Sequence, residues 1–151
     1  MPTEATIVLR ILIGTALAFV LGFERELRGS PAGDRTFSLT GAASTAITAV
    51  TFRQSPQAVA GVVTGIGFIG GAVVFHGDNT LIRGVTTAAT VFVTAAIGIV
   101  VGAGAPLAGV ALAALVLLVL EVRHVPILKY LDARRYQARF TNDTDVLGDD
   151  K

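Results

Sequence analysis

The sequence predicts an all-α, polytopic membrane protein with five transmembrane helices and a short juxtamembrane helix. Of the 151 residues, 52% are hydrophobic and only 15% are charged, whereas a typical soluble domain carries about 25% charged residues. A soluble fold of this size has too little charge to cover so much apolar surface. In addition, the apolar residues are gathered into runs close to the roughly 20 residues that a helix needs to cross a bilayer.

Five apolar runs are predicted to be helices, joined by short connections. The first run is continuous apart from Arg10, while the second is shorter, rich in Ser and Thr, and spans only with its flanks. The third and fourth runs have close to the required length, and the fifth opens with Pro106, which suits a first helical turn. None of the runs alternates as the strands of a membrane barrel do. The predicted spans are residues 5–23, 37–52, 57–75, 85–104 and 106–122, which make 1–122 the transmembrane domain.

The distribution of Lys and Arg predicts the orientation. With five spans, the loops 24–36 and 76–84 and the tail after residue 121 share one side, and they hold all of the 12 basic residues except Arg10 and Arg53. Short loops rich in Lys and Arg stay in the cytoplasm. We therefore expect the N-terminus outside and the C-terminus in the cytoplasm. No Lys or Arg precedes the first span, so we expect it to be retained rather than cleaved.

The residues after the last span are predicted to form two segments. Residues 123–140 combine apolar and basic side chains, which is typical of a helix that lies on the anionic inner leaflet. Residues 141–151 are acidic and are predicted to be disordered.

Glycines recur inside the predicted spans at the G-x-x-x-G spacing, which lets two helices approach closely. Tight helix packing is the simpler interpretation, and a helix that unwinds near the membrane centre to bind a solute is the alternative. One stretch also matches G-x-G-x-x-G, but it lies inside an apolar helix, where the nucleotide-binding meaning does not apply. The packing candidates are Gly14, Gly22, Gly61, Gly65, Gly67, Gly70, Gly71, Gly98 and Gly102.

Acidic and basic residues occur together at three predicted helix ends on the cytoplasmic side. A solvated loop is the simpler interpretation, and ion pairing between helical hairpins is the functional one. A glutamate at the end of the first span is expected to bridge to an arginine of another helix end or to the N-terminus of the fourth span, where a threonine hydroxyl is the expected cap. The candidate polar cluster comprises Glu24, Arg25, Glu26, Asp34, Arg35, Asp78, Arg83, Thr86 and Thr87. On the other side, Arg10 either snorkels to the outer interface or pairs across the bundle.

The composition argues against catalysis. The chain has no Cys and two His, so a thiolate site or a His-rich metal site is excluded. It also lacks a Ser-His-Asp set and an H-E-x-x-H motif. We therefore expect no enzyme activity, no metal, no cofactor and no nucleic-acid partner.

The polar and glycine motifs together resemble the membrane domain of the MgtC/SapB family. The resemblance covers roughly residues 9–120 and is carried by E-R-E from Glu24, T-G-I-G-F from Thr64 and R-G-V-T-T-A-A from Arg83. It implies a non-enzymatic protein of the bacterial inner membrane that is involved in adaptation to magnesium limitation, ion homeostasis or virulence-type regulation. It also implies membrane partners, of which ATP synthase is one. We expect contacts with membrane lipids and a homo-oligomer, with a dimer favoured. A small oligomeric transporter or channel for ions or solutes is the alternative function.

At three points the chain departs from the family pattern, and these points affect which properties of the family are expected of this chain. About 30 residues follow Glu121, fewer than the ACT-like domain of MgtC proper needs, so that domain is expected to be missing. Thr86 stands where MgtC proper has Asn, and Val93 where it has Cys. Asp34 occupies a position that is usually apolar in the family.

Overall fold

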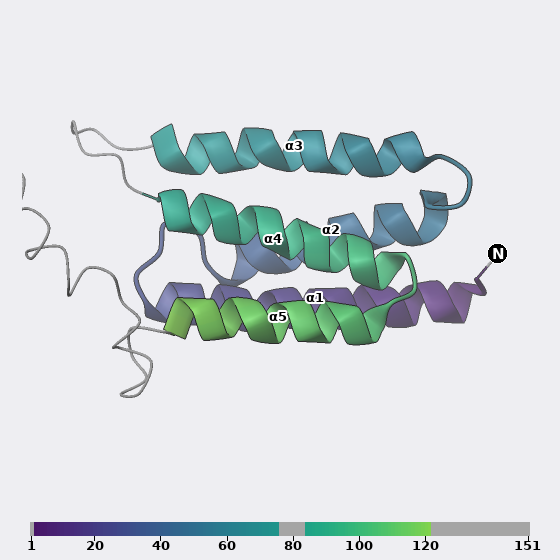
Figure 1. Cartoon of the computed structure of the whole chain (residues 1–151), viewed down its shortest axis with the longest axis horizontal. Coiled ribbons are helices and arrows are strands. Elements are labelled where there is room, and N and C mark those ends of the chain that lie inside the picture. Colours follow the sequence, from purple (N-terminus) through teal and green to yellow (C-terminus); the bar gives the residue numbers. More distant parts are fainter. Residues whose placement is uncertain (1, 76–83, 122–151) are drawn as a thin grey trace, which may run out of the picture. The chain divides into compact units, whose positions relative to one another are not determined.

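The computed structural model describes residues 2–75 and 84–121. They form five helices and no strand, so the predicted all-α class with five helices is confirmed (Figure 1). The helices are α1 (Glu4–Leu27), α2 (Asp34–Thr51), α3 (Pro56–Phe75), α4 (Val85–Gly102) and α5 (Pro106–Glu121). The chain divides into two compact units, Met1–Leu115 and Val116–Lys151. The predicted helix 123–140 and tail 141–151 lie outside the described residues.

Helix α1 continues beyond the predicted apolar run to Leu27. Its last turn is polar, but it stays helical because Arg28 lies one turn after Glu24 and its N–H bonds to the Glu24 carbonyl at 3.2 Å. The helix then stops at Gly29, whose φ of +68° is the left-handed conformation that ends many helices. The polar turn is therefore part of the helix rather than of a loop.

Consecutive helices run in opposite directions in the first unit (Figure 1). Helices α2 and α4 contact each other, and each also contacts α1 and α3. One end of this bundle carries the C-terminus of α1 and the N-termini of α2 and α4, and we call it the Glu24 end. The other end carries the N-terminus of α1 and the C-termini of α2 and α4, and we call it the Arg53 end.

Glycines allow α2 and α4 to pack with their backbones almost in contact. A Cβ atom on Gly98 would lie 2.8 Å from the Ser44 Cβ and 2.9 Å from the Gly41 carbonyl oxygen. A Cβ atom on Gly102 would lie 2.6 Å from the Thr45 carbonyl oxygen. Real Cβ atoms do not approach neighbours so closely, so a larger residue at either position would push the two helices apart.

The hydroxyl groups buried in this contact are bonded within their own helices. In α2, Ser44 and Thr45 each donate to the carbonyl four residues earlier at 2.7 Å. In α4, Thr94 does the same at 2.8 Å. Such local bonds satisfy a buried hydroxyl without a partner on another helix. The exception is the Thr48 Oγ1, which is fully buried and has no hydrogen-bond partner among the described residues.

Three of the five helices are long and apolar enough to cross a membrane: Glu4–Leu27, Pro56–Val74 and Val85–Gly102. Helix α5 is apolar but has only 16 residues, and α2 is not among the apolar helices because its 18 residues include Asp34, Arg35 and several Ser and Thr. Since α2 is packed against α1, α3 and α4, its hydroxyl groups are shielded by other helices. Spanning by all five helices stays a prediction.

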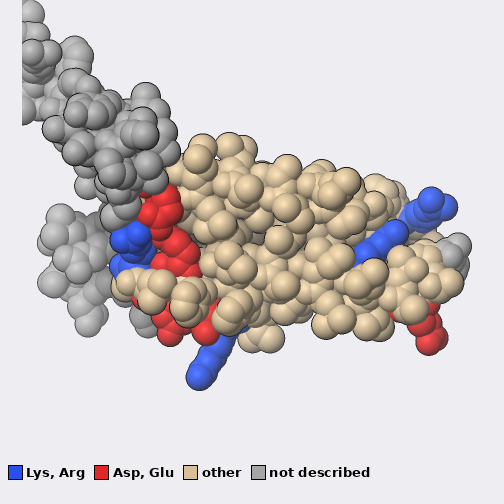
Figure 2. All heavy atoms as spheres, turned by 90° about the horizontal axis from the view of Figure 1, so that it is seen from below, with Lys and Arg blue, Asp and Glu red and all other residues tan. Residues whose placement is uncertain are grey.

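The outer surface of the helices is largely apolar. Leu39 and Leu107 are 71% and 85% exposed, and Phe68 is 83% exposed. On the face shown in Figure 2, charged side chains gather toward the two ends and leave a band of other residues between them. This is the surface expected of a protein whose middle lies in hydrocarbon.

Candidate functional site

An ion-pair cluster lies at the C-terminus of α1, at the Glu24 end. The Arg25 guanidinium donates two hydrogen bonds to the Glu24 carboxylate, from Nε to Oε2 at 2.5 Å and from Nη2 to Oε1 at 2.6 Å. Both side chains are only 12% exposed, and Arg28 approaches the same carboxylate with Nε at 3.5 Å from Oε1. Because a largely buried charge is costly without its partner, Glu24 holds both arginines at the end of the helix.

The Glu26 carboxylate provides the N-terminal cap of α2. The residue before α2 is Gly33, which has no side chain that could accept a hydrogen bond from the N–H groups of the helix end. The Glu26 Oε2 instead accepts a hydrogen bond from the Asp34 N–H at 3.0 Å. A carboxylate is favoured there because the N-terminus of a helix attracts negative charge. Glu26 thereby fixes the turn between α1 and α2.

Replacing Glu26 with alanine is expected to lower the free energy of unfolding by about 1 kcal/mol, which is the usual cost of losing a helix cap. Glu26→Gln keeps an oxygen acceptor and is expected to lose less than half as much. Reversible unfolding of the purified protein in mixed detergent micelles measures both values. Equal losses for the two variants would contradict a capping role.

A hydroxyl pair joins the α1–α2 turn to the start of α4. The Ser30 Oγ and the Thr87 Oγ1 lie 2.6 Å apart, and Thr87 is 5% exposed. The expected threonine cap of α4 is wrong: α4 begins at Val85, and its N-cap is Gly84, which makes no side-chain cap. Gly84 is suited to this position because its φ is +82° and because a Cβ atom there would lie 2.9 Å from the Val73 carbonyl oxygen of α3.

An open pocket of about 420 Å³ lies beside this turn. Glu26, Asp34 and Arg35 are among the residues that line it. It offers both signs of charge, and the Glu26 and Asp34 carboxylates beside Arg35 disfavour an anion such as phosphate.

The structure brings together part of the predicted polar cluster. Glu24, Arg25, Glu26, Asp34 and Arg35 gather at the C-terminus of α1 and the N-terminus of α2, with Thr87 joined through Ser30. Thr86 is exposed. Asp78 and Arg83 lie outside the described residues.

The predicted partners of the two glutamates differ from those observed. Glu24 pairs with Arg25 and with Arg28, which lies one turn later, rather than with Arg35. Glu26 caps α2 rather than α4. The contact between the hairpins is made by Ser30, which the sequence analysis missed. Its only sequence signal is its place before a proline in a short turn.

The candidate packing glycines fall into two groups. A Cβ atom on Gly14, Gly22, Gly98 or Gly102 would collide with α2, and Gly70 has ordinary contact with Ala88 of α4. In contrast, a Cβ atom on Gly61, Gly65, Gly67 or Gly71 of α3 would meet nothing within 4 Å.

Arg10 turns toward the bundle at the Arg53 end. Its Nη1 donates to the Gly102 carbonyl at the end of α4, at 2.8 Å. The partner across the bundle is thus a backbone carbonyl rather than an acidic side chain. Within residues 2–75 and 84–121, no group of three or more His, Cys, Asp or Glu is arranged to hold a metal ion.

Apolar helices with charges gathered at their ends define a helical membrane protein. The chain belongs to the MgtC family, whose model matches residues 11–126, and the predicted resemblance is thereby confirmed. It is 37% identical to the putative magnesium transporter YhiD of Escherichia coli, over 80% of this chain and 61% of that protein. It is 30% identical to protein SapB of Bacillus subtilis, over 67% of this chain and 49% of SapB. It is 41% identical to protein MgtC of Brucella abortus, over 58% of this chain and 39% of MgtC.

The chain thus spans less than two thirds of the length of each of these three relatives. No solved structure matches it.

Proposed function

We propose that the chain is a non-enzymatic protein of the bacterial inner membrane that acts in adaptation to magnesium limitation or in ion homeostasis, through contacts between membrane helices. Membership of the MgtC family supports the general role. The segregation of Lys and Arg supports a cytoplasmic Glu24 end. The partner we propose for the helix contact is a second copy of the chain.

The observation that carries this proposal is the unpacked glycine face of α3. Each glycine inside a helix costs about 0.8–1.0 kcal/mol relative to alanine. In α1 and α4 close helix packing explains this cost, whereas a Cβ atom on any of four glycines of α3 would meet no atom of the described residues within 4 Å. A contact outside the single chain accounts for them.

The outward face of α3 has the shape that helix association requires. At 100° per residue, Ala60, Thr64, Gly67 and Gly71 fall on one stripe, and the first three are exposed. Small residues at this spacing let two helices approach closely in a membrane. We call these four residues the α3 stripe.

Phe68 projects beside the α3 stripe and is 83% exposed. A face that carries both a projecting ring and flat glycine positions is complementary to itself. Such a face suits a two-fold contact, in which the ring of each copy packs on the glycines of the other.

Helix α5 presents a different surface. Its exposed side chains include Leu107 and Leu115, at 85% and 55%. Bulky aliphatic side chains pack well against lipid and hold a second backbone at a distance. The α3 stripe is therefore the better surface for a helix contact.

Growth under magnesium limitation tests the proposed function. A strain that lacks the gene is complemented with the wild type, with Gly67→Leu in the α3 stripe, or with Leu107→Ala in α5 as the matched exposed control. We expect Gly67→Leu to fail and Leu107→Ala to restore growth. Full restoration by Gly67→Leu, at equal protein level in the membrane, would contradict the proposal.

Transport is the alternative, and the name of the YhiD relative favours it. The close packing of Gly98 and Gly102 against α2 opposes a path between α2 and α4 of one protomer, so such a path would have to lie between copies. Magnesium flux into liposomes distinguishes the alternatives. Flux equal to that of empty liposomes rules transport out.

A further inference from the structure

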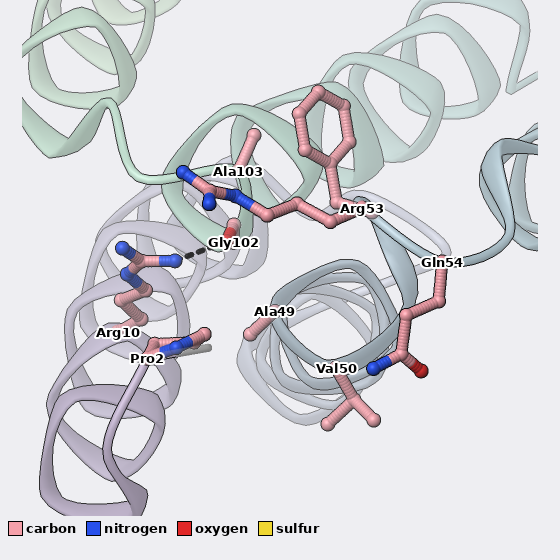
Figure 3. Close-up of a pocket in the computed structure, with 9 residues that line it drawn as sticks. Pro2, Arg10, Ala49, Val50, Arg53, Gln54, Gly102 and Ala103 are labelled. Atoms are coloured by element: carbon pink, nitrogen blue, oxygen red, sulfur yellow. Dashed lines mark hydrogen bonds between the residues drawn. The ribbon is translucent and has the colours of Figure 1, made fainter.

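A pocket at the Arg53 end is built around two arginines. It has a volume of about 290 Å³ and lies among the N-terminal part of α1, the end of α2 with its following turn, and the end of α4 (Figure 3). Arg10 comes from α1 and Arg53 from the turn after α2. Among the described residues, none that lines this pocket is acidic.

Arg10 is held in place with most of its donors unused. It is half-buried, and one nitrogen of its guanidinium donates to the Gly102 carbonyl at 2.8 Å. Gly104, with a φ of +102°, makes room for this group, because a Cβ atom there would lie 2.8 Å from the Arg10 Nη2. A guanidinium has five N–H donors, and within the described residues only one of those of Arg10 is used, which leaves four for a ligand.

Arg53 brings a second guanidinium to the same place. Figure 3 shows its side chain extending from the turn after α2 toward the end of α4, where Arg10 also ends. Within residues 2–75 and 84–121, neither arginine has an ion pair. Two like charges that converge without an acidic partner repel each other unless an anion joins them.

The helix ends around the pocket do not cancel these charges. The C-termini of α2 and α4 each carry the equivalent of about half a negative charge. Two guanidinium groups against two such ends leave a net positive charge of about one. The pocket therefore favours an anion with several oxygen atoms, because each guanidinium binds a pair of oxygens through parallel N–H groups.

We propose that this pocket binds a phosphate group, either as free phosphate or as the phosphate of a lipid headgroup. Both sources present the same tetrahedral oxyanion to the two guanidinium groups. Arg53 lies beyond the end of α2, and the ends of membrane-spanning helices lie next to the polar headgroup region of the bilayer. In this arrangement Arg10 contacts the phosphate group from the side of the bundle, and Arg53 contacts it from the turn after α2.

The test uses the full chain, purified in detergent and stripped of lipid, with two probes. Inorganic phosphate is titrated by calorimetry, and dioleoyl phosphatidic acid is compared with dioleoylglycerol, which lacks the phosphate, by native mass spectrometry. Arg53→Gln is the main variant because Arg53 is exposed and its loss spares the fold. Arg35→Gln removes the same charge at the Glu24 end and is the matched control.

We expect the wild type to bind at least one phosphate probe and not dioleoylglycerol. Arg53→Gln is expected to weaken that binding about tenfold or more, while Arg35→Gln stays within about twofold of the wild type. Binding of inorganic phosphate identifies the free anion, and binding of phosphatidic acid alone identifies a lipid headgroup. The proposal is overturned if neither probe binds, if Arg53→Gln binds like the wild type, or if Arg35→Gln weakens binding as much as Arg53→Gln.

Discussion

Replacing Gly98 with leucine is expected to prevent stable folding, with a loss of about 3 kcal/mol or more in the free energy of unfolding. The new side chain would begin at a Cβ that lies 2.8 Å from the Ser44 Cβ and 2.9 Å from the Gly41 carbonyl oxygen. The second neighbour is backbone, so it cannot rotate away, and α2 and α4 must separate. This places the variant at or above the upper end of the usual cost of overpacking, about 1–3 kcal/mol.

Gly67→Leu is the matched control for this result. It makes the same change in chain composition, but a Cβ atom on Gly67 meets nothing within 4 Å. Because leucine is the better helix former, the unfolding free energy of the monomer is expected to stay equal or rise by up to about 1 kcal/mol. Unfolding by denaturing detergent measures both variants. Similar losses at Gly98 and Gly67 would contradict the packing described for α2 and α4.

The second large effect is expected from the same Gly67→Leu variant in association rather than in folding. A leucine in the α3 stripe would hold a second helix away from the glycine positions on which the proposed dimer packs Phe68 of the other copy. We expect the dimer to dissociate at least about tenfold more readily, which corresponds to about 1.4 kcal/mol. Sedimentation in density-matched detergent, or fluorescence transfer between labelled copies in vesicles, measures the change.

A smaller substitution at the same position tests whether the size of the side chain determines the strength of association. Gly67→Ala adds only a methyl group and keeps a small residue in the stripe, so its dimer is expected to lie between those of the wild type and Gly67→Leu. An association constant that is the same for all three proteins would show that α3 faces lipid instead of another copy.

Much of the fold followed from the sequence because the apolar runs are long and well separated. The five helices were predicted in the right order, and most of their ends lie within a few residues of the runs. The end of α1 was missed because this turn is mostly polar, although Glu24 and Arg28 stand at the i,i+4 spacing at which opposite charges support a helix. A hydropathy pattern does not reveal ion pairs of this kind.

The sequence indicated which charged residues stand near one another at the helix ends, but not which groups form contacts. The charge pattern placed Glu24, Glu26 and Arg35 at one end of the bundle, but it did not determine which groups meet. That depended on the glycine before α2, which leaves the helix end open to the Glu26 carboxylate, and on Ser30, which reaches Thr87 from 57 residues away in sequence. Contacts over such separations depend on packing that a single sequence does not reveal.

The most direct measurement of the central claim is disulfide cross-linking in native membranes. The chain has no Cys, so Thr64→Cys places one thiol in the middle of the α3 stripe, and Val110→Cys places one on α5 as the control. We predict that mild oxidation joins two copies through position 64 rapidly and through position 110 slowly or not at all. Cross-linking through position 110 with none through position 64 would contradict a contact between copies at α3.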